Sequence, residues 1–344
     1  VIGVYMMPGA NLVISILGAL RAGIIYVPLD PKQARLRLQN IAEDAQLDGV
    51  LFEEIRIEEA TELFKNQDIF TFSSLLKKIV KKEHPFVVKQ DDQVYRIFTS
   101  GSTGRPKGCC ICHKHLVHLF TGTGHHLKLN SEDRWIMLHS FGFDFSVWEI
   151  WGAIWSGASV YIPEENIFGN PKKLKNVLKE KKITILNTTP GAFYALIDTD
   201  DFKENWEETI RYVIFGGDKL EPHRFQKWYS AKNPYHLKLI NMYGITETTV
   251  HNTFKEITSE EIYSLKKLSP IGKPFTGVKM YCFDSYFNEL PIGVVGELFI
   301  GGGGVSGGYH NQPELTKKVF LQHPNSKNSL LYKSGDLAFK GSEE

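Results

Sequence analysis

The sequence predicts an α/β fold with layered, mostly parallel sheets, followed by a small β-rich, barrel-like subdomain. Apolar runs of strand length at 183–187, 211–215 and 237–241 alternate with helical patterns that begin near Gly191 and Pro222. This alternation is typical of βαβ units and a parallel sheet. After residue 268 the pattern changes to short strands separated by turns rich in glycine and proline. We therefore expect an α/β core over 1–268 and a β-rich subdomain over 269–344.

The remaining elements follow from local composition. The apolar start, 1–27, is interrupted by proline, glycine and Arg21 too early for a membrane span or a clean signal peptide. The charged stretches 53–67 and 77–83 predict solvated helices or linkers, and the basic run 172–182 predicts a helix with one solvated face.

Composition limits the class of function. The chain has 344 residues, 42% of them hydrophobic, which is enough for a large core. A formal net charge of +1 argues against nucleic acid as the main ligand. Three of the four cysteines, Cys109, Cys110 and Cys112, are close neighbours, which favours a reducing cytoplasm. We expect a buried strand there, with a zinc site as the weaker alternative because no second ligand pair follows.

Residues 99–108 combine small, hydroxyl-bearing and cationic side chains after a predicted strand. Glycines let backbone N–H groups approach an anion, while hydroxyls and Lys107 add donors and a charge. The Walker arrangement is excluded because Pro106 precedes Lys107 and Gly108 follows it. A flexible surface turn is the alternative. We predict a phosphate-binding loop, with contacts from Thr99, Ser100, Gly101, Ser102, Thr103, Gly104 and Lys107.

Polar turns follow the predicted parallel strands at 187–190, 216–218 and 243–247. Ligands of open α/β sheets bind at the carboxyl ends of the strands. The sequence therefore places these three turns at one ligand-binding edge of the sheet.

The loop, the Tyr243-Gly-Ile-Thr-Glu247 turn and the Ser334-Gly-Asp336 turn together resemble the adenylate-forming enzymes. This superfamily contains acyl-CoA synthetases, luciferases and the adenylation domains of nonribosomal peptide synthetases. The resemblance covers nearly the whole chain. At Asp218 the family more often has glutamate, and at Gly307 and Gln312 it commonly has arginine.

The resemblance implies ATP and Mg²⁺ as ligands. Thr246 would contact the α-phosphate, Glu247 would hold the metal, and Tyr243 would pack on the adenine, although a strand end with a capped helix would also explain this turn. Asp336 would bind the ribose hydroxyls. The implied catalytic residues are Lys107, Thr246 and Glu247, and the implied nucleotide contacts beyond the loop are Gly216, Gly217, Asp218, Tyr243, Gly244, Thr246 and Asp336.

Residues 143–149 resemble the segment that opens the substrate pocket in amino-acid-activating members. A carboxylate among aromatic residues needs a partner, and the α-ammonium of an amino acid would pair with Asp144. The alternative is a helix cap for a helix starting near Val147. The implied lining resembles that of threonine-activating domains and consists of Asp144, Phe145, Trp148, Asn187, Ile214, Gly216, Met242, Val250 and His251.

The resemblance implies that the carboxylate of an amino acid attacks the α-phosphate of ATP. L-threonine is the amino acid that the implied pocket favours. The aminoacyl adenylate would pass to phosphopantetheine on a peptidyl carrier domain, beside a condensation domain of the same cytoplasmic assembly line. An acyl- or aryl-CoA ligase and a non-catalytic nucleotide-binding relic are the alternatives. The chain lacks an initiating Met and ends before the family's lid domain, so we expect a fragment with an incomplete catalytic set. We expect neither a nucleic acid nor a membrane partner.

Overall fold

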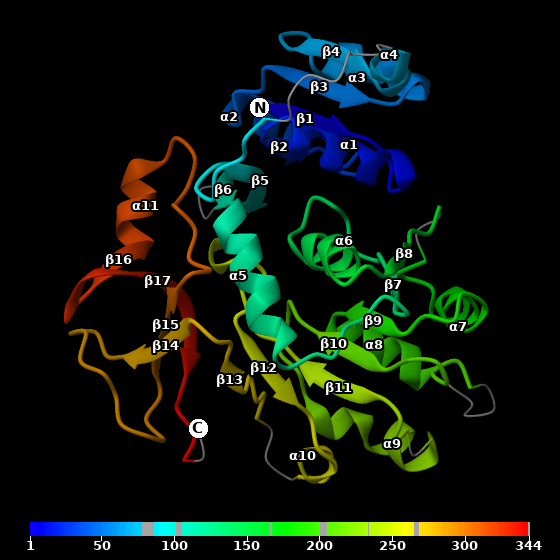
Figure 1. Ribbon diagram of the computed structural model, residues 1–344. Coiled ribbons are helices and arrows are strands. Elements are labelled where there is room, and N and C mark those ends of the chain that lie inside the picture. The colour runs from blue at the N-terminus through cyan, green and yellow to red at the C-terminus, as the bar shows by residue number, and fades with distance from the viewer. Residues whose placement is uncertain are drawn as a thin grey trace.

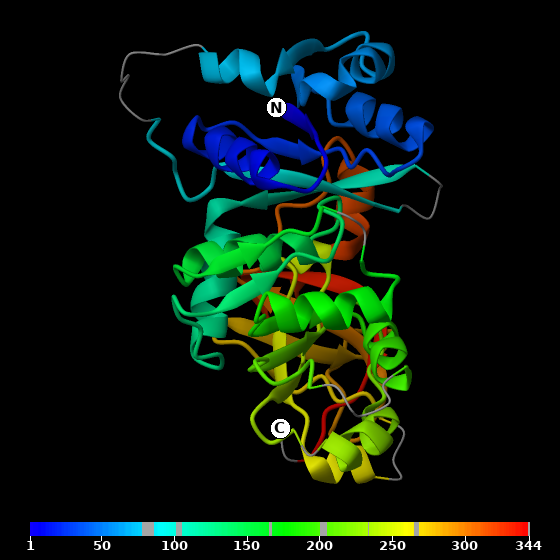
Figure 2. The ribbon, with the colours of Figure 1, turned by 90° about the vertical axis from the view of Figure 1, so that its right-hand side faces the viewer.

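The computed structural model describes residues 1–77, 86–100, 105–164, 167–199, 205–232, 234–264 and 268–342. Among these residues the strands form three sheets. Figures 1 and 2 show the first sheet at one end of the molecule, the second beyond it, and the third beside both. None of the described helices is both long and apolar enough to span a bilayer.

The first sheet has the strand order β4-β3-β1-β2-β5-β6. Its neighbouring strands are parallel except β5 and β6, which form an antiparallel pair. The strands are β1 (Ile2–Tyr5), β2 (Tyr26–Pro28), β3 (Gly49–Phe52), β4 (Asp68–Thr71), β5 (Gln93–Ser100) and β6 (Pro106–Cys112). The accompanying helices are α1 (Ala10–Arg21), α2 (Arg35–Asp44), the short turn η1 (Glu54–Arg56), α3 (Ile57–Leu63), α4 (Phe72–Lys77) and α5 (His113–Gly124).

The cysteine cluster lies on β6, as the buried-strand interpretation predicts. Cys109 and Cys110 are buried, Cys112 is half-buried, and all three are free thiols. No group of three or more potential metal-ligating side chains occurs among the described residues.

The second sheet has the order β13-β12-β11-β10-β9-β7-β8. The predicted parallel strands are present as β9 (Ile185–Thr188), β10 (Tyr212–Phe215) and β11 (Lys238–Asn241), joined by β7 (Arg134–Ile136) and β8 (Ser159–Tyr161). Two antiparallel strands, β12 (Thr253–Glu256) and β13 (Lys273–Pro274), extend it. Its helical segments are α6 (Phe145–Trp155), α7 (Pro171–Glu180), α8 (Pro190–Asp198), η2 (Pro222–Phe225), α9 (Gln226–Lys232), η3 (Thr246–Thr248) and α10 (Ser259–Tyr263).

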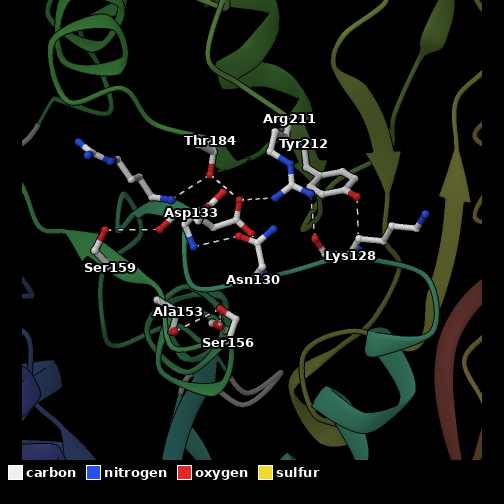
Figure 3. A network of polar contacts seen from close by, with 12 residues as sticks. Lys128, Asn130, Asp133, Ala153, Ser156, Ser159, Thr184, Arg211 and Tyr212 are labelled. Carbon is white, nitrogen blue, oxygen red and sulfur yellow. Dashed lines mark hydrogen bonds and ion pairs between the residues drawn. The ribbon is translucent and has the colours of Figure 1, made fainter.

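A buried carboxylate ties together the amino ends of three strands in this sheet (Figure 3). Asp133 precedes β7 and is 1% exposed; its Oδ1 accepts from Arg211 Nη1 at 2.6 Å and from Thr184 Oγ1 at 2.8 Å. Asp133 Oδ2 accepts from the backbone N–H of Asn130 at 2.9 Å. Thr184 and Arg211 directly precede β9 and β10. A buried charge needs such partners, so this network fixes the amino ends of β7, β9 and β10 relative to one another. The predicted ligand-binding turns lie at the opposite, carboxyl ends of β9 and β10.

The third sheet is antiparallel and open, with the order β14-β15-β17-β16. It contains β14 (Val278–Phe283), β15 (Gly296–Gly302), β16 (Phe320–His323) and β17 (Ser326–Ala338), with helix α11 (Pro313–Val319). The predicted fold class, parallel sheets plus a small β-rich part, is confirmed. The largest buried cluster includes Phe275 and Ile300 together with residues of the α/β part, so the core continues across the predicted boundary at 268/269.

Packing at α6 provides a test of this core. A Cβ added at Gly152 would lie 2.4 Å from Cη2 of the fully buried Trp135, whereas one added at Gly191 of α8 meets nothing within 4 Å. We expect Gly152→Ala to lower the free energy of unfolding by about 1–3 kcal/mol through overpacking. Gly191→Ala should be neutral or stabilising. Urea unfolding followed by tryptophan fluorescence measures both, and equal midpoints would contradict this packing.

Candidate active site

The three sheets meet at a buried ion pair. Lys107 near the start of β6 donates to Glu247 Oε1 at 2.7 Å, and Glu247 lies on η3, just after β11. Tyr309, from the loop before α11, donates to the same oxygen at 2.5 Å and accepts from Lys107 Nζ at 2.7 Å. The hydroxyl of Tyr332 on β17 lies 3.3 Å from that of Tyr309. Two predicted catalytic residues, 140 positions apart, are therefore in direct contact.

The electrostatics of this cluster favour an ionised carboxylate. Burial opposes the charge of Glu247, but hydrogen bonds from Lys107 and Tyr309 outweigh it and hold the pKa of Glu247 below its ordinary value. Burial and the neighbouring carboxylate raise the pKa of Tyr309 and Tyr332, so both phenols stay protonated as donors. Sequence reasoning assigned no role to these tyrosines. Tyr309 follows Gly308, between the two positions 307 and 312 where the family commonly has arginine, and Tyr332 directly precedes the Lys-Ser-Gly-Asp stretch at 333–336.

The predicted phosphate loop connects the two antiparallel strands β5 and β6, whose register pairs Thr99 with Lys107 and Ser100 with Pro106. Ser100 is exposed, and Thr99 Oγ1 is buried without a partner among the described residues. The loop residues Gly101, Ser102, Thr103 and Gly104 lie outside the described residues. The two ends of the loop thus place Thr99 and Lys107 side by side.

The predicted adenine and ribose residues come from two sheets. Tyr243, after β11, donates from its hydroxyl to Asp336 Oδ2 on β17 at 2.6 Å, across 93 residues of sequence. Burial and this carboxylate raise the pKa of Tyr243. Asp336 is exposed and follows Gly335, whose φ of +82° suits glycine. The exposed carboxylate is available to further donors.

The turn after β10 carries Gly216, Gly217 and Asp218, in the order the sequence predicts. Gly217 has φ +80°, a left-handed conformation that favours glycine, and Asp218 accepts from the backbone N–H of Lys219 at 2.7 Å. Gly216 is buried, and an added Cβ there would lie 3.1 Å from the ring of His251. Glycine at this position leaves room beside the predicted pocket.

The predicted pocket residues converge on an aromatic cluster between α6 and the carboxyl ends of β9 and β10. The ring of His251 contacts Phe145 and Trp148 edge-to-face, with centroids 5.2 and 5.3 Å apart. Trp148 Nε1 donates to Asn187 Oδ1 at 2.9 Å. Ile214 pairs with Asn187 in the sheet register, and the N–H of Met242 donates to the carbonyl of Phe215 at 2.9 Å.

Two polar side chains of this pocket are incompletely paired. Within the described part of the chain, Asn187 Nδ2 and both ring nitrogens of His251 are buried without a hydrogen-bond partner. His251 is 4% exposed, and burial lowers the pKa of its imidazole to about 3, so the ring is neutral. Unpaired buried polar groups cost free energy. Because these atoms lie together beside Phe145 and Trp148, they are available to a polar ligand bound there.

Asp144 lies at the N-terminal boundary of α6, but its side chain makes no capping hydrogen bond there. The helix-cap alternative therefore lacks its expected bond. Burial raises the pKa of Asp144 to about 6, a hydrogen bond to Thr246 opposes this, and the charge of Glu247 adds to it. The carboxylate is thus close to the catalytic candidates. Within the described part of the chain it forms no ion pair with a lysine or arginine, and only the neighbouring His139 ring favours its charge electrostatically.

A buried pair not predicted from the sequence supports the pocket wall. Glu149 on α6 is fully buried and accepts from the backbone N–H groups of Leu138 and His139, and its Oε1 lies 2.8 Å from His139 Nδ1. The ring of His139 stacks on Phe145 at 4.2 Å. Glu149 therefore holds the end of β7 against α6. The only indication of this role in the sequence is that Glu149 belongs to the segment 143–149, which resembles the opening of the substrate pocket.

The donor set at Glu247 suits a metal bound mainly by its substrate. The described residues bring no third metal-ligating side chain to this carboxylate. Mg²⁺ is characteristically held by one or two carboxylates together with waters and phosphate oxygens. Glu247 with the neighbouring Thr246 hydroxyl fits that pattern, and a dedicated protein cage is not formed.

Comparison with known families gives one match over most of the chain. The family model described as AMP-binding enzyme matches residues 1–310.

Individual relatives agree with the family model. Malpinin synthetase from Mortierella alpina is 38% identical over 333 residues, covering 95% of this chain and 4% of the relative. A dimodular nonribosomal peptide synthase from Bacillus subtilis is 33% identical over 342 residues, covering 95% of this chain and 14% of the relative. This chain thus spans a small part of each. The N-terminal subdomain of Klebsiella oxytoca NpsA, solved with 3-hydroxybenzoyl-AMSN, has the same fold: its TM-score is 0.86 at 23% identity, over 99% of this chain and 84% of that one.

The Lys107–Glu247 pair predicts a pH-dependent stability. The lowered pKa of Glu247 means that the pair stabilises the fold above the unfolded value of about 4.5 and that this contribution is lost as pH falls through the folded pKa. We expect Lys107→Met to lower the free energy of unfolding by about 1.5–3 kcal/mol near neutral pH. The loss should shrink on acidification, because protonated Glu247 no longer needs the cation.

Lys114→Met is the matched control, since its pair with Asp91 is exposed at both ends. Denaturant unfolding of the two variants across neutral to acidic pH measures the difference. A loss independent of pH, or equal to that of the control, would contradict the role of the buried pair.

Proposed function

The chain belongs to the AMP-binding enzyme family, and on that premise we propose that it activates an amino acid, best L-threonine, as an aminoacyl adenylate. ATP is the co-substrate and pyrophosphate the second product. The observation that carries this proposal is the pocket beside Glu247: within the described residues no lysine or arginine pairs with Asp144, and Asn187 Nδ2 and both ring nitrogens of His251 have no hydrogen-bond partner.

The nucleotide is assigned to the junction of the three sheets. Asp336, which lies beside Tyr243, accepts hydrogen bonds from the ribose hydroxyls. The turn at Gly216 and Gly217 lies against the edge of the adenine. Lys107 meets the phosphates from the loop between β5 and β6. These assignments follow the family resemblance, and the contacts between Lys107 and Glu247 and between Tyr243 and Asp336 support them.

The amino acid is assigned to the aromatic pocket. Its α-ammonium pairs with Asp144, and its side-chain hydroxyl bonds Asn187 Nδ2 or His251. Phe145, Trp148 and Met242 restrict the volume, while Ile214 and Val250 suit a methyl group. Valine is rejected because it leaves those polar groups unpaired. Serine differs from threonine by one methyl, worth about 1–3 kcal/mol, so it is the expected side substrate.

The reaction is an in-line attack of the amino acid carboxylate on the α-phosphorus. The new O–P bond forms as the bond to pyrophosphate breaks, with no covalent enzyme intermediate. Thr246 positions the α-phosphate, and Lys107 offsets the developing charge once a phosphate replaces its contact with Glu247. Mg²⁺ held at Glu247 supplies further charge neutralisation.

The adenylate is then transferred to the thiol of a phosphopantetheine arm. We assign that arm to a peptidyl carrier domain, with a condensation domain, in a nonribosomal peptide synthetase. The match to a dimodular nonribosomal peptide synthase supports this assignment. The alternative, a CoA ligase, is disfavoured because its fatty or aryl acid substrate has no ammonium group to pair with Asp144.

Two measurements test the function. The first is binding of sulfamoyl analogues of aminoacyl adenylates to the 344-residue chain by calorimetry, with threonyl, seryl, valyl and benzoyl forms. The second is amino-acid-dependent exchange of pyrophosphate into ATP by a chain extended through a lid domain. Threonine should give the strongest signal in both. Preference for the benzoyl form would indicate an aryl-activating enzyme, and binding of all analogues with similar affinity but no pyrophosphate exchange with any acid would favour a nucleotide-binding relic.

The neutral ring of His251 predicts how threonine is distinguished from valine. His251→Phe keeps the ring packing against Phe145 and Trp148 but removes both nitrogens. We expect the preference for the threonyl over the valyl analogue to fall by at least about tenfold. His126→Phe is the control, because the His126 ring lies outside the pocket and stacks on Phe254, with the two ring centroids 4.9 Å apart. Unchanged preference in both variants would exclude His251 as the hydroxyl partner.

The raised pKa of Asp144 predicts a pH dependence of substrate binding. Pairing with an ammonium requires the ionised carboxylate, so affinity should fall as pH drops below about 6. In that range the dissociation constant of the threonyl analogue should rise about tenfold per pH unit. An analogue without the amino group serves as the comparison and should lack this dependence. Parallel profiles for the two analogues would refute the assignment of Asp144.

A further inference from the structure

Two consecutive residues before His251 adopt a backbone conformation that side chains rarely take. Thr249 has φ +64° and Val250 has φ +66°, both in the left-handed region. The conformation is uncommon for any residue other than glycine and is especially unfavourable for β-branched ones. Such strain persists only where surrounding contacts over-determine it, and it concentrates at functional sites.

The contacts that hold this turn are buried and reciprocal. Thr249 Oγ1 donates to the carbonyl of Gly304 at 2.7 Å. Asn252 Nδ2 donates to the carbonyl of Thr248 at 2.9 Å, and the Thr248 hydroxyl donates to Asn252 Oδ1. The N–H of His251 donates to the carbonyl of Thr249 at 2.8 Å. The turn is therefore closed on itself, and bonds to Gly304, Tyr243 and Phe275 anchor it to its surroundings.

Glycines on both sides of the turn leave the space that it needs. A Cβ at Gly244 would lie 2.1 Å from the carbonyl oxygen of Val250, and one at Gly304 would lie 2.9 Å from that of Thr248. Gly304 ends the glycine run 301–304, which the sequence marked only as a turn of the β-rich part. The same part of the chain carries Tyr309 and Asp336.

We infer that Thr249 is a positioning residue for substrate selection, because its hydroxyl on Gly304 holds Val250 and His251 in the wall of the amino acid pocket. This inference rests on the proposed function for the identity of the substrate. The Thr249 hydroxyl donates to Gly304, and the Thr249 backbone bonds its neighbours in the turn: its N–H donates to the carbonyl of Thr246 at 3.3 Å and its carbonyl accepts from the N–H of His251 at 2.8 Å. The side chain of Thr249 therefore acts on the pocket through the turn.

The test compares Thr249→Val, which keeps the branched shape but loses the hydroxyl donor, with Thr249→Ser, which keeps the donor. Calorimetric titration of the 344-residue chain with threonyl and valyl sulfamoyl adenosine gives the two dissociation constants. In Thr249→Val the preference for the threonyl form should fall about tenfold, equivalent to about 1.4 kcal/mol. Thr249→Ser should restore it. A purely structural role would lower the unfolding midpoint and leave the preference unchanged.

A second measurement is independent of the substrate. Nuclear magnetic resonance of labelled histidines follows the His251 ring between about pH 8 and pH 5, where burial against Phe145, Trp148 and Gly216 keeps the wild-type ring neutral. Among the described residues, the other titratable groups of this pocket are the His139 ring and the Asp144 carboxylate. In Thr249→Val the His251 signal should begin to titrate in this range as water enters, and in Thr249→Ser it should not.

The two readouts separate the possible failures. If wild-type protein binds no aminoacyl analogue but His251 titrates only in Thr249→Val, the proposed substrate is wrong and the positioning role stands. If wild-type protein prefers the threonyl form and Thr249→Val changes neither the preference nor the titration, the positioning role is overturned and the proposed function stands.

Discussion

The contact between Lys107 and Glu247 is the constraint on which the candidate site depends, because residues from all three sheets meet there. Lys107 belongs to the first sheet, Glu247 follows a strand of the second, and the two tyrosines that share the carboxylate belong to the third part. A charge removed from water is tolerated only with such partners. The relative placement of the sheets is therefore coupled to the protonation and pairing of one carboxylate.

The second sheet divides its polar groups between two edges. At the amino ends, Asp133 is fully engaged by Arg211, Thr184 and Asn130 (Figure 3). At the carboxyl ends, Asn187 and His251 retain unpaired polar atoms. The first arrangement stabilises the parallel strands, and the second leaves buried polar groups unpaired at a cost in stability, as the proposed amino acid pocket requires. This division explains why a polar pocket can exist beside an aromatic core.

The parts of the fold that could be predicted from the sequence are those that depend on short-range patterns of residues. Strand length, alternation with helices and the polar turns after β9, β10 and β11 placed the binding edge, and the motif residues Lys107, Glu247, Tyr243 and Asp336 come together in pairs. The roles of Tyr309, Tyr332 and Glu149 were missed. Their contacts join residues that no helical or strand periodicity relates, so they arise only from packing between elements. The left-handed turn at Thr249 and Val250 could not be predicted either, because neither residue is a glycine or asparagine, the residue types that usually mark this conformation.

The hairpin geometry of β5 and β6 has a consequence for how phosphate charge is balanced. In loops that lead from a strand into a helix, aligned peptide dipoles at the helix start contribute positive potential. Here the residues after the turn continue as an antiparallel strand, and strand dipoles largely cancel. At the Lys107 end of the predicted phosphate loop, positive potential therefore comes from the lysine side chain and not from a helix dipole, so a phosphate bound there should be held more weakly as ionic strength rises.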